Sequence, residues 1–149
     1  MAEQNVKKSN TGLIIGLVCA IVVIAGVMAA IYFINKPKAQ QGTKAYTVAV
    51  VDKDGNSKDY TGKTDAEFLR GLMDELQAGG DFSYVGEDSD YGLYITTING
   101  ITPDYNTDGA YWAIYVNGEY GMYGADAQPV NDGDSFKFVY EVYQADDQQ

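Results

Sequence analysis

Apolar residues follow two different patterns along this chain of 149 residues. The first is an unbroken run of 22 residues, 13–34, which contains no charged side chain. As a helix, a run of this length spans about 33 Å, close to the thickness of a membrane's hydrocarbon core. Tyr32 and Phe33 lie near its end, where aromatic side chains favour the membrane interface. The pattern predicts a single transmembrane helix over residues 13–34, preceded by a short polar tail, residues 1–12.

The main alternative for this apolar run is a cleaved signal peptide. Such a peptide has a shorter apolar core that is followed by a small-residue cleavage site. Val27-Met28-Ala29 fits such a site, but the apolar residues continue to Ile34, which favours an anchor that stays attached. Lysines flank the run on both sides, so the positive-inside rule does not decide which end is cytoplasmic.

The second pattern begins after a polar linker, residues 35–44, and is an alternation of apolar and polar residues. Alternation at period two is typical of strands. It predicts strands at residues 45–51, 58–62, 91–98, 111–116 and 136–143, with a short extended piece at 82–85 inside a loop. Asn117-Gly118 predicts a tight hairpin turn, because the positive φ angles of such a turn favour these two residue types, and Asn99-Gly100 is a second turn signal.

One segment changes to the 3.6-residue period of a helix. Its apolar residues recur on one face, and they are Phe68, Leu69, Leu72, Met73 and Leu76. Thr64 and Glu67 fit a capping box, in which the two side chains bond backbone amides at the start of a helix. Gly79-Gly80 is a typical helix end. We therefore predict a helix that starts at this capping box and packs its apolar face on the sheet.

The order of these elements predicts the fold class. A hairpin, one helix and then several strands indicate an α+β fold, a mixed sheet with one packed helix. In the strand at residues 111–116, Trp112 shares a face with Ile114 and Val116, and Tyr115 lies on the other face. We expect the Trp112 face to be core. The domain is predicted to cover residues 45–143, with a frayed tail at 144–149.

Charge is distributed unevenly between the two parts of the chain. Residues 1–44 carry five lysines and one acidic residue, whereas residues 45–149 carry five basic and 20 acidic side chains, a net charge of −15. Phosphate backbones repel so acidic a domain, which argues against nucleic acid as a partner. The chain has no histidine and one cysteine, Cys19. This composition excludes intrachain disulfides, Cys/His zinc sites and Ser-His or Cys-His nucleophile pairs. No catalytic residue and no cofactor is predicted.

Three short motifs of the domain resemble those of a known family. They are Ile98-Asn99-Gly100, a W-x-x-Y-V-N-G segment at residues 112–118, and Asp132-Gly133-Asp134 before the last strand. Following a hairpin and a helix in this order, they resemble the transcobalamin C-terminal-like domain. That domain is a module of the soluble-ligand-binding β-grasp group, and many bacterial surface proteins carry it as a domain of unknown function. The resemblance covers about residues 45–143.

The resemblance implies a β-grasp-like fold and a non-enzymatic binding role outside the cytoplasm. In the vitamin carriers of this family a similar domain covers one face of cobalamin, which implies a corrinoid-like small molecule as a candidate ligand. We therefore expect a single-pass cell-membrane protein with a cytoplasmic N-terminus, whose extracytoplasmic C-terminal domain binds a soluble ligand. The alternative is a cell-surface module for protein or glycan interaction, that is, for adhesion.

Aromatic residues around the Asn117-Gly118 turn form the candidate binding site. Tyrosine offers a rigid contact area with a polar tip, which suits the surface that holds a ligand or partner. The predicted ligand-binding residues are Trp112, Tyr115, Asn117, Gly118, Tyr120 and Tyr123. A concave pocket beside the turn would favour the soluble ligand, and a flat aromatic patch would favour adhesion.

A second candidate site is an acidic loop before the strand at residues 111–116. Asp104, Asn106, Asp108 and Gly109 match the first half of a calcium-binding EF-hand loop. The twelfth position of such a loop is a glutamate, but here it is Tyr115, inside a predicted strand. We therefore expect an Asx turn at this point and predict no metal site.

The unbroken apolar run generates a prediction about processing. We expect the protein extracted from membranes to keep residues 1–34, because the apolar run passes the candidate cleavage site without interruption. Intact-mass analysis measures this directly. A mature N-terminus near Ala30 would contradict the prediction of an anchor.

Overall fold

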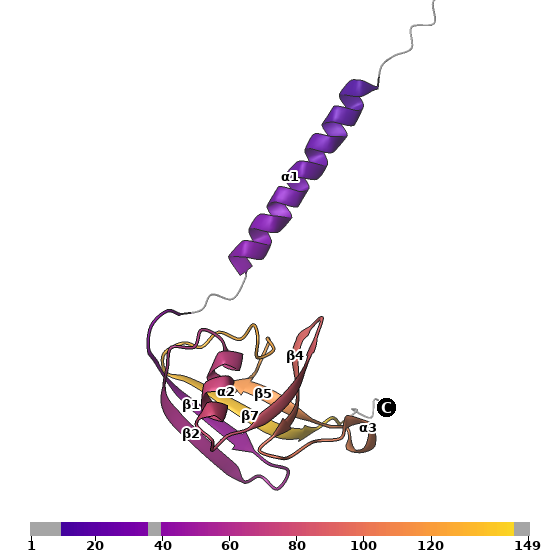
Figure 1. The fold of residues 1–149 in the computed structure, drawn as a ribbon. Helices are drawn as coiled ribbons and strands as arrows, with labels where there is room; N and C mark the ends of the chain where they lie inside the picture. Colours follow the sequence, from indigo (N-terminus) through magenta and orange to yellow (C-terminus); the bar gives the residue numbers. More distant parts are fainter. Residues whose placement is uncertain (1–9, 36–39, 145–149) are drawn as a thin grey trace, which may run out of the picture. The chain divides into compact units, whose positions relative to one another are not determined.

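The computed structural model describes residues 10–35 and 40–144. They belong to two compact units, Met1–Lys36 and Pro37–Gln149, and each unit is described by itself (Figure 1). Most of the predicted N-terminal tail (residues 1–9), the middle of the predicted linker (36–39) and nearly all of the predicted C-terminal tail (145–149) lie outside the described residues.

The first unit contains one helix, α1, Thr11–Asn35. It extends two residues before and one residue beyond the apolar run, and all its side chains are exposed. The helix is long and apolar enough to cross a membrane. An apolar surface on every side suits lipid rather than the packed face of a soluble domain. The length and composition of α1 are therefore consistent with a membrane-spanning helix near the N-terminus.

The second unit contains seven strands and two helices within its described residues. In chain order they are β1 (Lys44–Val51), β2 (Ser57–Thr64), α2 (Leu69–Ala78), β3 (Tyr84–Ser89), β4 (Gly92–Ile98), α3 (Tyr105–Asp108), β5 (Ala110–Val116), β6 (Glu119–Tyr120) and β7 (Asp134–Val142). The predicted strands are all present, with ends that differ by a few residues.

Five of the strands form one mixed sheet in the order β2-β1-β7-β5-β6. The first and last strands, β1 and β7, lie side by side and run parallel, while the other neighbours are antiparallel. The β3–β4 hairpin forms a separate two-stranded sheet. Helix α2 lies across one face of the large sheet (Figure 1). This arrangement confirms the predicted α+β fold with a mixed, β-grasp-like sheet and one packed helix.

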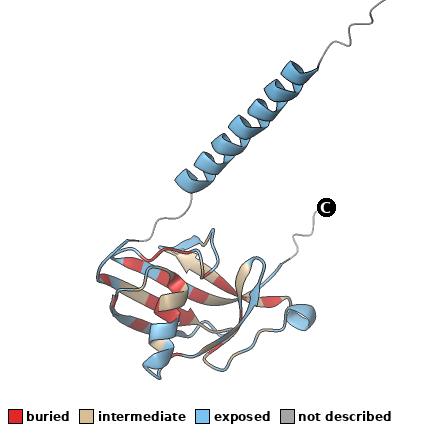
Figure 2. Ribbon diagram, turned by 45° about the horizontal axis from the view of Figure 1, so that its top comes forward, coloured by how far each residue is buried: buried red, intermediate tan, exposed pale blue. Residues whose placement is uncertain are grey.

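The core lies between the large sheet, α2 and the β3–β4 hairpin, where the buried segments of Figure 2 converge. Val48 and Val50 of β1 pair with Phe136 and Phe138 of β7, so their side chains share one face of the sheet. Packed against that face are Leu69, Leu72 and Met73 from α2, and Phe82 and Ile98 from the hairpin region. All these side chains are almost completely buried, and burying one of their size stabilises the fold by about 1.5–3 kcal/mol.

The predicted capping box is wrong. Thr64 ends β2, its hydroxyl accepts a hydrogen bond from the Ala66 amide and donates one to Glu75, and the helix begins only at Leu69. Instead, Phe68 forms a β-bridge with Pro129, and the Glu67 carbonyl accepts from the Val130 amide. Tertiary pairing thus holds residues 67–68 in an extended conformation that a local capping motif does not predict.

Carbonyl groups from another loop take over the role of the cap. The amide of Leu69 donates to the Gln128 carbonyl at 2.9 Å, and the amide of Arg70 donates to the Ala125 carbonyl at 3.0 Å. The first amides of a helix have no partner inside the helix, so these two bonds satisfy them. They also attach the loop at residues 121–130 to the start of α2.

Part of the predicted linker belongs to the folded domain. Lys44 is the first residue of β1, and its buried ammonium group donates a hydrogen bond to the Gln40 carbonyl at 2.6 Å. Gln41 donates to Glu67, and Thr43 donates to Asp65. Residues 40–44 are therefore hydrogen-bonded to the folded domain.

Two segments predicted as loops contain regular structure. β3 begins at Tyr84, inside the predicted extended piece at residues 82–85, and continues through Ser89 into a stretch that is predicted as loop and is fully exposed from Glu87 on. Within the predicted loop at residues 101–109, Asp104 caps the short helix α3: its carboxylate accepts from the Asn106 and Thr107 amides. Those bonds are the Asx-type turn expected there, and they lower the pKa of Asp104.

The Asn117-Gly118 turn has the predicted geometry. Asn117 has φ 51° and Gly118 has φ 85°, both in the left-handed region that a type I′ turn requires. Beyond the turn, β6 pairs only Tyr120 with Tyr115 and Glu119 with Val116. The predicted hairpin is therefore confirmed, with a second strand of only two residues.

This geometry predicts that Gly118→Val lowers the free energy of unfolding by about 1–3 kcal/mol, because a β-branched residue is strongly disfavoured at positive φ. A Cβ at Gly118 would have no heavy atom within 4 Å, so the cost comes from the backbone alone. Gly124→Val is the matched control, since that site is equally open and its φ lies outside the left-handed region. Chemical denaturation of both variants measures the difference. Equal stability of the two would contradict the turn type.

Candidate functional site

A cavity of about 410 Å³ lies beside the Asn117-Gly118 turn, and we call it the turn cavity. Its walls come from the end of β5, from β6 and from the loop that follows. The lining residues are Val116, Asn117, Glu119, Tyr120, Gly121, Met122, Tyr123 and Gln128. The side chain of Met122 is 89% exposed, and those of Tyr120 and Tyr123 are 58% and 41% exposed. The cavity therefore has large apolar groups at a solvent-accessible rim.

The structure divides the six predicted ligand-binding residues among three places. Asn117, Tyr120 and Tyr123 line the turn cavity. Tyr115 and Gly118 line a neighbouring hollow of about 280 Å³, together with residues of β7. Trp112 is buried in the core, as expected for its face of the strand.

The Trp112 side chain is held by two contacts within the fold. Its indole Nε1 donates a hydrogen bond to the Ile101 carbonyl at 3.2 Å, and its ring meets Tyr140 edge to face, with centroids 5.8 Å apart. The indole ring is packed against Tyr140, and its N–H group has a hydrogen-bond acceptor. Trp112 thus supports the strand beneath the candidate surfaces.

Tyr115 and Tyr120 connect the two hollows. Their rings meet edge to face with centroids 5.5 Å apart, across the register of β5 and β6. The Tyr115 hydroxyl donates to the Glu141 carboxylate at 2.9 Å, and this hydrogen bond, with some burial, raises the pKa of Tyr115. Tyr115, which is held by Glu141, therefore fixes the position of the Tyr120 ring at the cavity rim.

Asn117 uses its side chain to hold the turn. Its Nδ2 donates to Asp134 at 2.9 Å, and its Oδ1 accepts from the Ser135 amide at 2.9 Å. The other oxygen of Asp134 accepts from the Asn131 amide. These bonds join the turn after β5 to the Asp132-Gly133-Asp134 segment before β7. They explain why the two motifs occur together, and they make Asn117 a residue that shapes the cavity wall.

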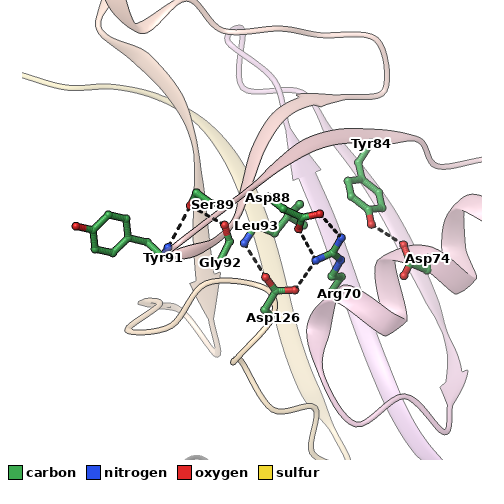
Figure 3. Close-up of polar contacts among 9 residues, drawn as sticks. All are labelled: Arg70, Asp74, Tyr84, Asp88, Ser89, Tyr91, Gly92, Leu93 and Asp126. Carbon is green, nitrogen blue, oxygen red and sulfur yellow. Dashed lines mark hydrogen bonds and ion pairs between the residues drawn. The ribbon is translucent and has the colours of Figure 1, made fainter.

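A charged cluster, drawn in Figure 3, fixes the loop that follows β6. The Arg70 guanidinium forms ion pairs with Asp88 at 2.8 Å and Asp126 at 2.9 Å. The second oxygen of Asp126 accepts from the Leu93 amide at 2.6 Å. Asp126 belongs to the loop that also supplies Met122 and Tyr123, so α2, the β3–β4 hairpin and this loop are tied together at one point.

A second polar contact lies on the same side of α2. The Tyr84 hydroxyl donates to Asp74 at 2.5 Å (Figure 3), and burial together with this carboxylate raises the pKa of Tyr84 to about 12. The contact joins the start of β3 to the middle of α2. The hairpin is thus attached to the helix at two places, through Arg70 and through Tyr84.

The residues predicted from the sequence include neither the Arg70 cluster nor five residues of the cavity lining, Val116, Glu119, Gly121, Met122 and Gln128. Met122 and Gln128 lie in a glycine-rich loop without periodicity, so no pattern indicates which way they point. Arg70 is the chain's only arginine. A single arginine among many carboxylates was the one available signal, because guanidinium groups pair with two carboxylates readily.

Metal-ligating side chains are not gathered in the part of the chain that the structure describes. Within residues 10–35 and 40–144, no three Asp, Glu, Cys or His side chains lie close enough together to hold a metal ion. Asp104 of the EF-hand-like segment directs its carboxylate to the backbone of α3 instead.

Comparison with known families identifies the domain. Residues 62–142 match the model of a family described as "Domain of unknown function (DUF4430)", a match over more than half of the chain. The chain belongs to this DUF4430 family. No curated protein matches the chain.

Two solved structures are similar to the domain. A protein from Ruminococcus gnavus ATCC 29149, described as a "putative metal binding protein", is 31% identical with a TM-score of 0.61. The match covers 68% of this chain and 99% of that protein. Haptocorrin in complex with Cbi is 22% identical with a TM-score of 0.63, over 70% of this chain and 26% of haptocorrin. The likeness to haptocorrin shows a common fold alone, and it confirms the transcobalamin-like architecture that the sequence motifs imply.

The Arg70 cluster generates a prediction about stability. Arg70→Met removes both ion pairs and keeps a long apolar side chain, so the free energy of unfolding should fall slightly. The loss is small because the paired side chains are partly or largely exposed, and exposed pairs contribute about 0–1 kcal/mol each. Denaturant titration should show that the loss shrinks in about 1 M salt, where the Debye length is about 3 Å.

Lys53→Met is the control, because Lys53 is an exposed residue of the β1–β2 turn. This variant should keep the stability of the parent. If Arg70→Met loses as much stability at high salt as at low salt, the charges of the cluster do not hold the loop.

Proposed function

We propose that this domain is a non-catalytic, extracytoplasmic module that binds a soluble ligand in the turn cavity and is anchored to the membrane by α1. The observation that carries the proposal is the concave shape of the surface beside the Asn117-Gly118 turn. Its volume of about 410 Å³ lies within the usual range of small-molecule sites, about 300–1,000 Å³.

The chemistry of the cavity rim supports a ligand with apolar surface. Met122, Tyr120 and Tyr123 are large and exposed, and such side chains around a hollow are typical of binding surfaces. Methionine adapts its shape to different ligands, while tyrosine presents a rigid ring. Gln128 and Glu119 add polar atoms that could orient the ligand.

The ordered walls of the cavity support a preformed site. Asn117 and Asp134 hold the turn, and Arg70 and Asp126 hold the opposite loop. A site that is already shaped loses less entropy when it binds a ligand. The adhesion alternative is favoured by a flat aromatic patch, whereas here Tyr120 and Tyr123 border a concave surface.

The similar structures suggest which ligands to test first. Haptocorrin has a similar fold and was crystallised with Cbi, so a corrinoid is the first small molecule to test. The R. gnavus protein is described as binding metal, but the described residues of this chain gather no set of metal-ligating side chains. We therefore propose a small organic ligand.

The location rests on two separate arguments. The apolar helix α1 supports a single-pass anchor in the cell membrane. The resemblance to surface-protein domains supports an extracytoplasmic position for the domain. Protease added to intact cells would digest an extracytoplasmic domain and spare a cytoplasmic one, so this experiment tests the orientation.

The test of binding begins with the full chain extracted in detergent. Mass spectrometry of co-purifying small molecules identifies the candidate, and calorimetric titration measures its affinity, with a corrinoid as the first probe. Tyr120→Ala and Tyr123→Ala should each weaken binding by roughly 30-fold, corresponding to about 2 kcal/mol for a binding hot spot. Both residues are substantially exposed, so the melting temperature should change little.

Tyr91→Ala is the matched control, because Tyr91 is 99% exposed at the tip of the β3–β4 hairpin. It should leave the affinity unchanged. Full affinity in both Tyr120→Ala and Tyr123→Ala would contradict the turn cavity as the site, and loss of folding in both would show that these rings belong to the core.

A further inference from the structure

Four tyrosines from distant parts of the chain surround a second hollow of about 370 Å³, which we call the tyrosine cup. Its lining residues are Tyr94 of β4, Tyr105 of α3, Tyr111 of β5, and Tyr143, which follows β7. None of them lines the turn cavity. The two hollows are neighbours, because the Tyr111 side chain interacts with that of Tyr120 in the turn cavity, but they share no lining residue. An inference from the cup does not depend on the proposed function.

Backbone pairing brings these tyrosines together. Tyr143 donates its amide hydrogen to the Gly109 carbonyl at 2.8 Å, which continues the β5–β7 pairing beyond the last strand. Gly109 ends α3, whose start is capped by Asp104, so Tyr105 is held next to the same strand end. The cup is thus built on hydrogen-bonded backbone where β5 begins and β7 ends.

The rings of the cup are accessible and stand apart. Tyr94, Tyr105 and Tyr143 are each more than half exposed. Among the described residues, none of the four rings packs against another aromatic ring. Their faces remain available, with space between them for a group that is not part of the fold.

The charges around the cup are negative. All four lining residues are uncharged tyrosines, and Tyr111 lies directly opposite Glu141 in the β5–β7 register. Tyr105 lies in α3 next to its cap residue Asp104, and exposed Asp108 ends that helix. The part of the chain from residue 45 carries a net charge of −15. Such a field attracts cations to the cup and repels anions.

We propose that the tyrosine cup binds a small soluble organic cation that carries a quaternary ammonium group. Aromatic faces attract such a cation through their quadrupoles, and this is the usual way in which proteins recognise quaternary ammonium compounds. A quaternary ammonium has no N–H group that needs a hydrogen-bond acceptor. It therefore suits a cup of rings better than a primary amine or a metal ion, both of which require several oxygen ligands.

The test compares choline with 3,3-dimethyl-1-butanol, its uncharged analogue of nearly the same shape, by calorimetric titration of the full chain in a maltoside detergent. Choline should bind about three- to thirtyfold more tightly, the range expected for a cation–π contribution. Equal affinity of the two compounds would show an apolar hollow rather than a cation site, and absence of choline binding would also overturn the proposal.

Four variants locate the site. Tyr105→Leu and Tyr143→Leu should each weaken choline binding by about three- to tenfold, because each removes one exposed aromatic face. Tyr143→Phe keeps the face and should remain within about twofold of the parent. Tyr91→Leu alters a fully exposed tyrosine outside the cup and should have no effect. If Tyr91→Leu weakens binding as much as the cup variants, the cation is bound without a defined site.

Two further measurements separate the cup from the rest of the protein. Tyr123→Ala, in the turn cavity, should leave choline binding unchanged. The choline titrations therefore test the cup, and the titrations with the co-purified ligand or a corrinoid test the turn cavity. Melting curves of all variants should match the parent, because the changed side chains are largely exposed. If Tyr105→Leu and Tyr143→Leu remain folded and keep full affinity for choline, the proposal is wrong.

Discussion

The parallel pairing of β1 with β7 is the constraint on which the rest of this domain depends. A tight turn cannot join parallel neighbours, so the chain between them must cross over one face of the sheet. That crossover contains α2 and the β3–β4 hairpin, and both pack on the face that carries Val48 and Phe136. The core therefore occupies one side of the sheet. Aromatic residues at the strand ends and on the other side remain available for binding.

The turn cavity lies at the Asn117-Gly118 turn, and residues that do not line the cavity hold its walls in place. Asn117 is held by Asp134, from the segment before β7, and the loop opposite is held by Arg70 of α2. The same loop provides the carbonyl groups that satisfy the first amides of α2. Because one loop completes the helix start and also forms a cavity wall, a change that breaks these backbone hydrogen bonds should destabilise both the helix start and the wall.

The sequence predicts best those features that depend on local chemistry. Asn117 and Gly118 adopt the positive φ angles that their residue types favour, and alternation correctly places Trp112 in the core. The start of α2 could not be predicted in this way, since Phe68 pairs with Pro129, which is remote in the sequence. The tyrosine cup could not be predicted from the sequence either, because only the folded domain brings Tyr94 and Tyr143 to the same hollow.

The two hollows offer different chemistry on one acidic domain, and this difference constrains what each can hold. The turn cavity combines rings with Met122, Gln128 and Glu119, so it can satisfy a ligand that has both apolar surface and hydrogen-bonding groups. The tyrosine cup is lined by tyrosines alone, so its ring faces provide the direct contacts for a cation, in the negative field of the domain. Arg70, the single arginine, is already paired with two carboxylates. A ligand with a net negative charge would therefore find little compensation at either hollow, whereas neutral and cationic ligands avoid that cost.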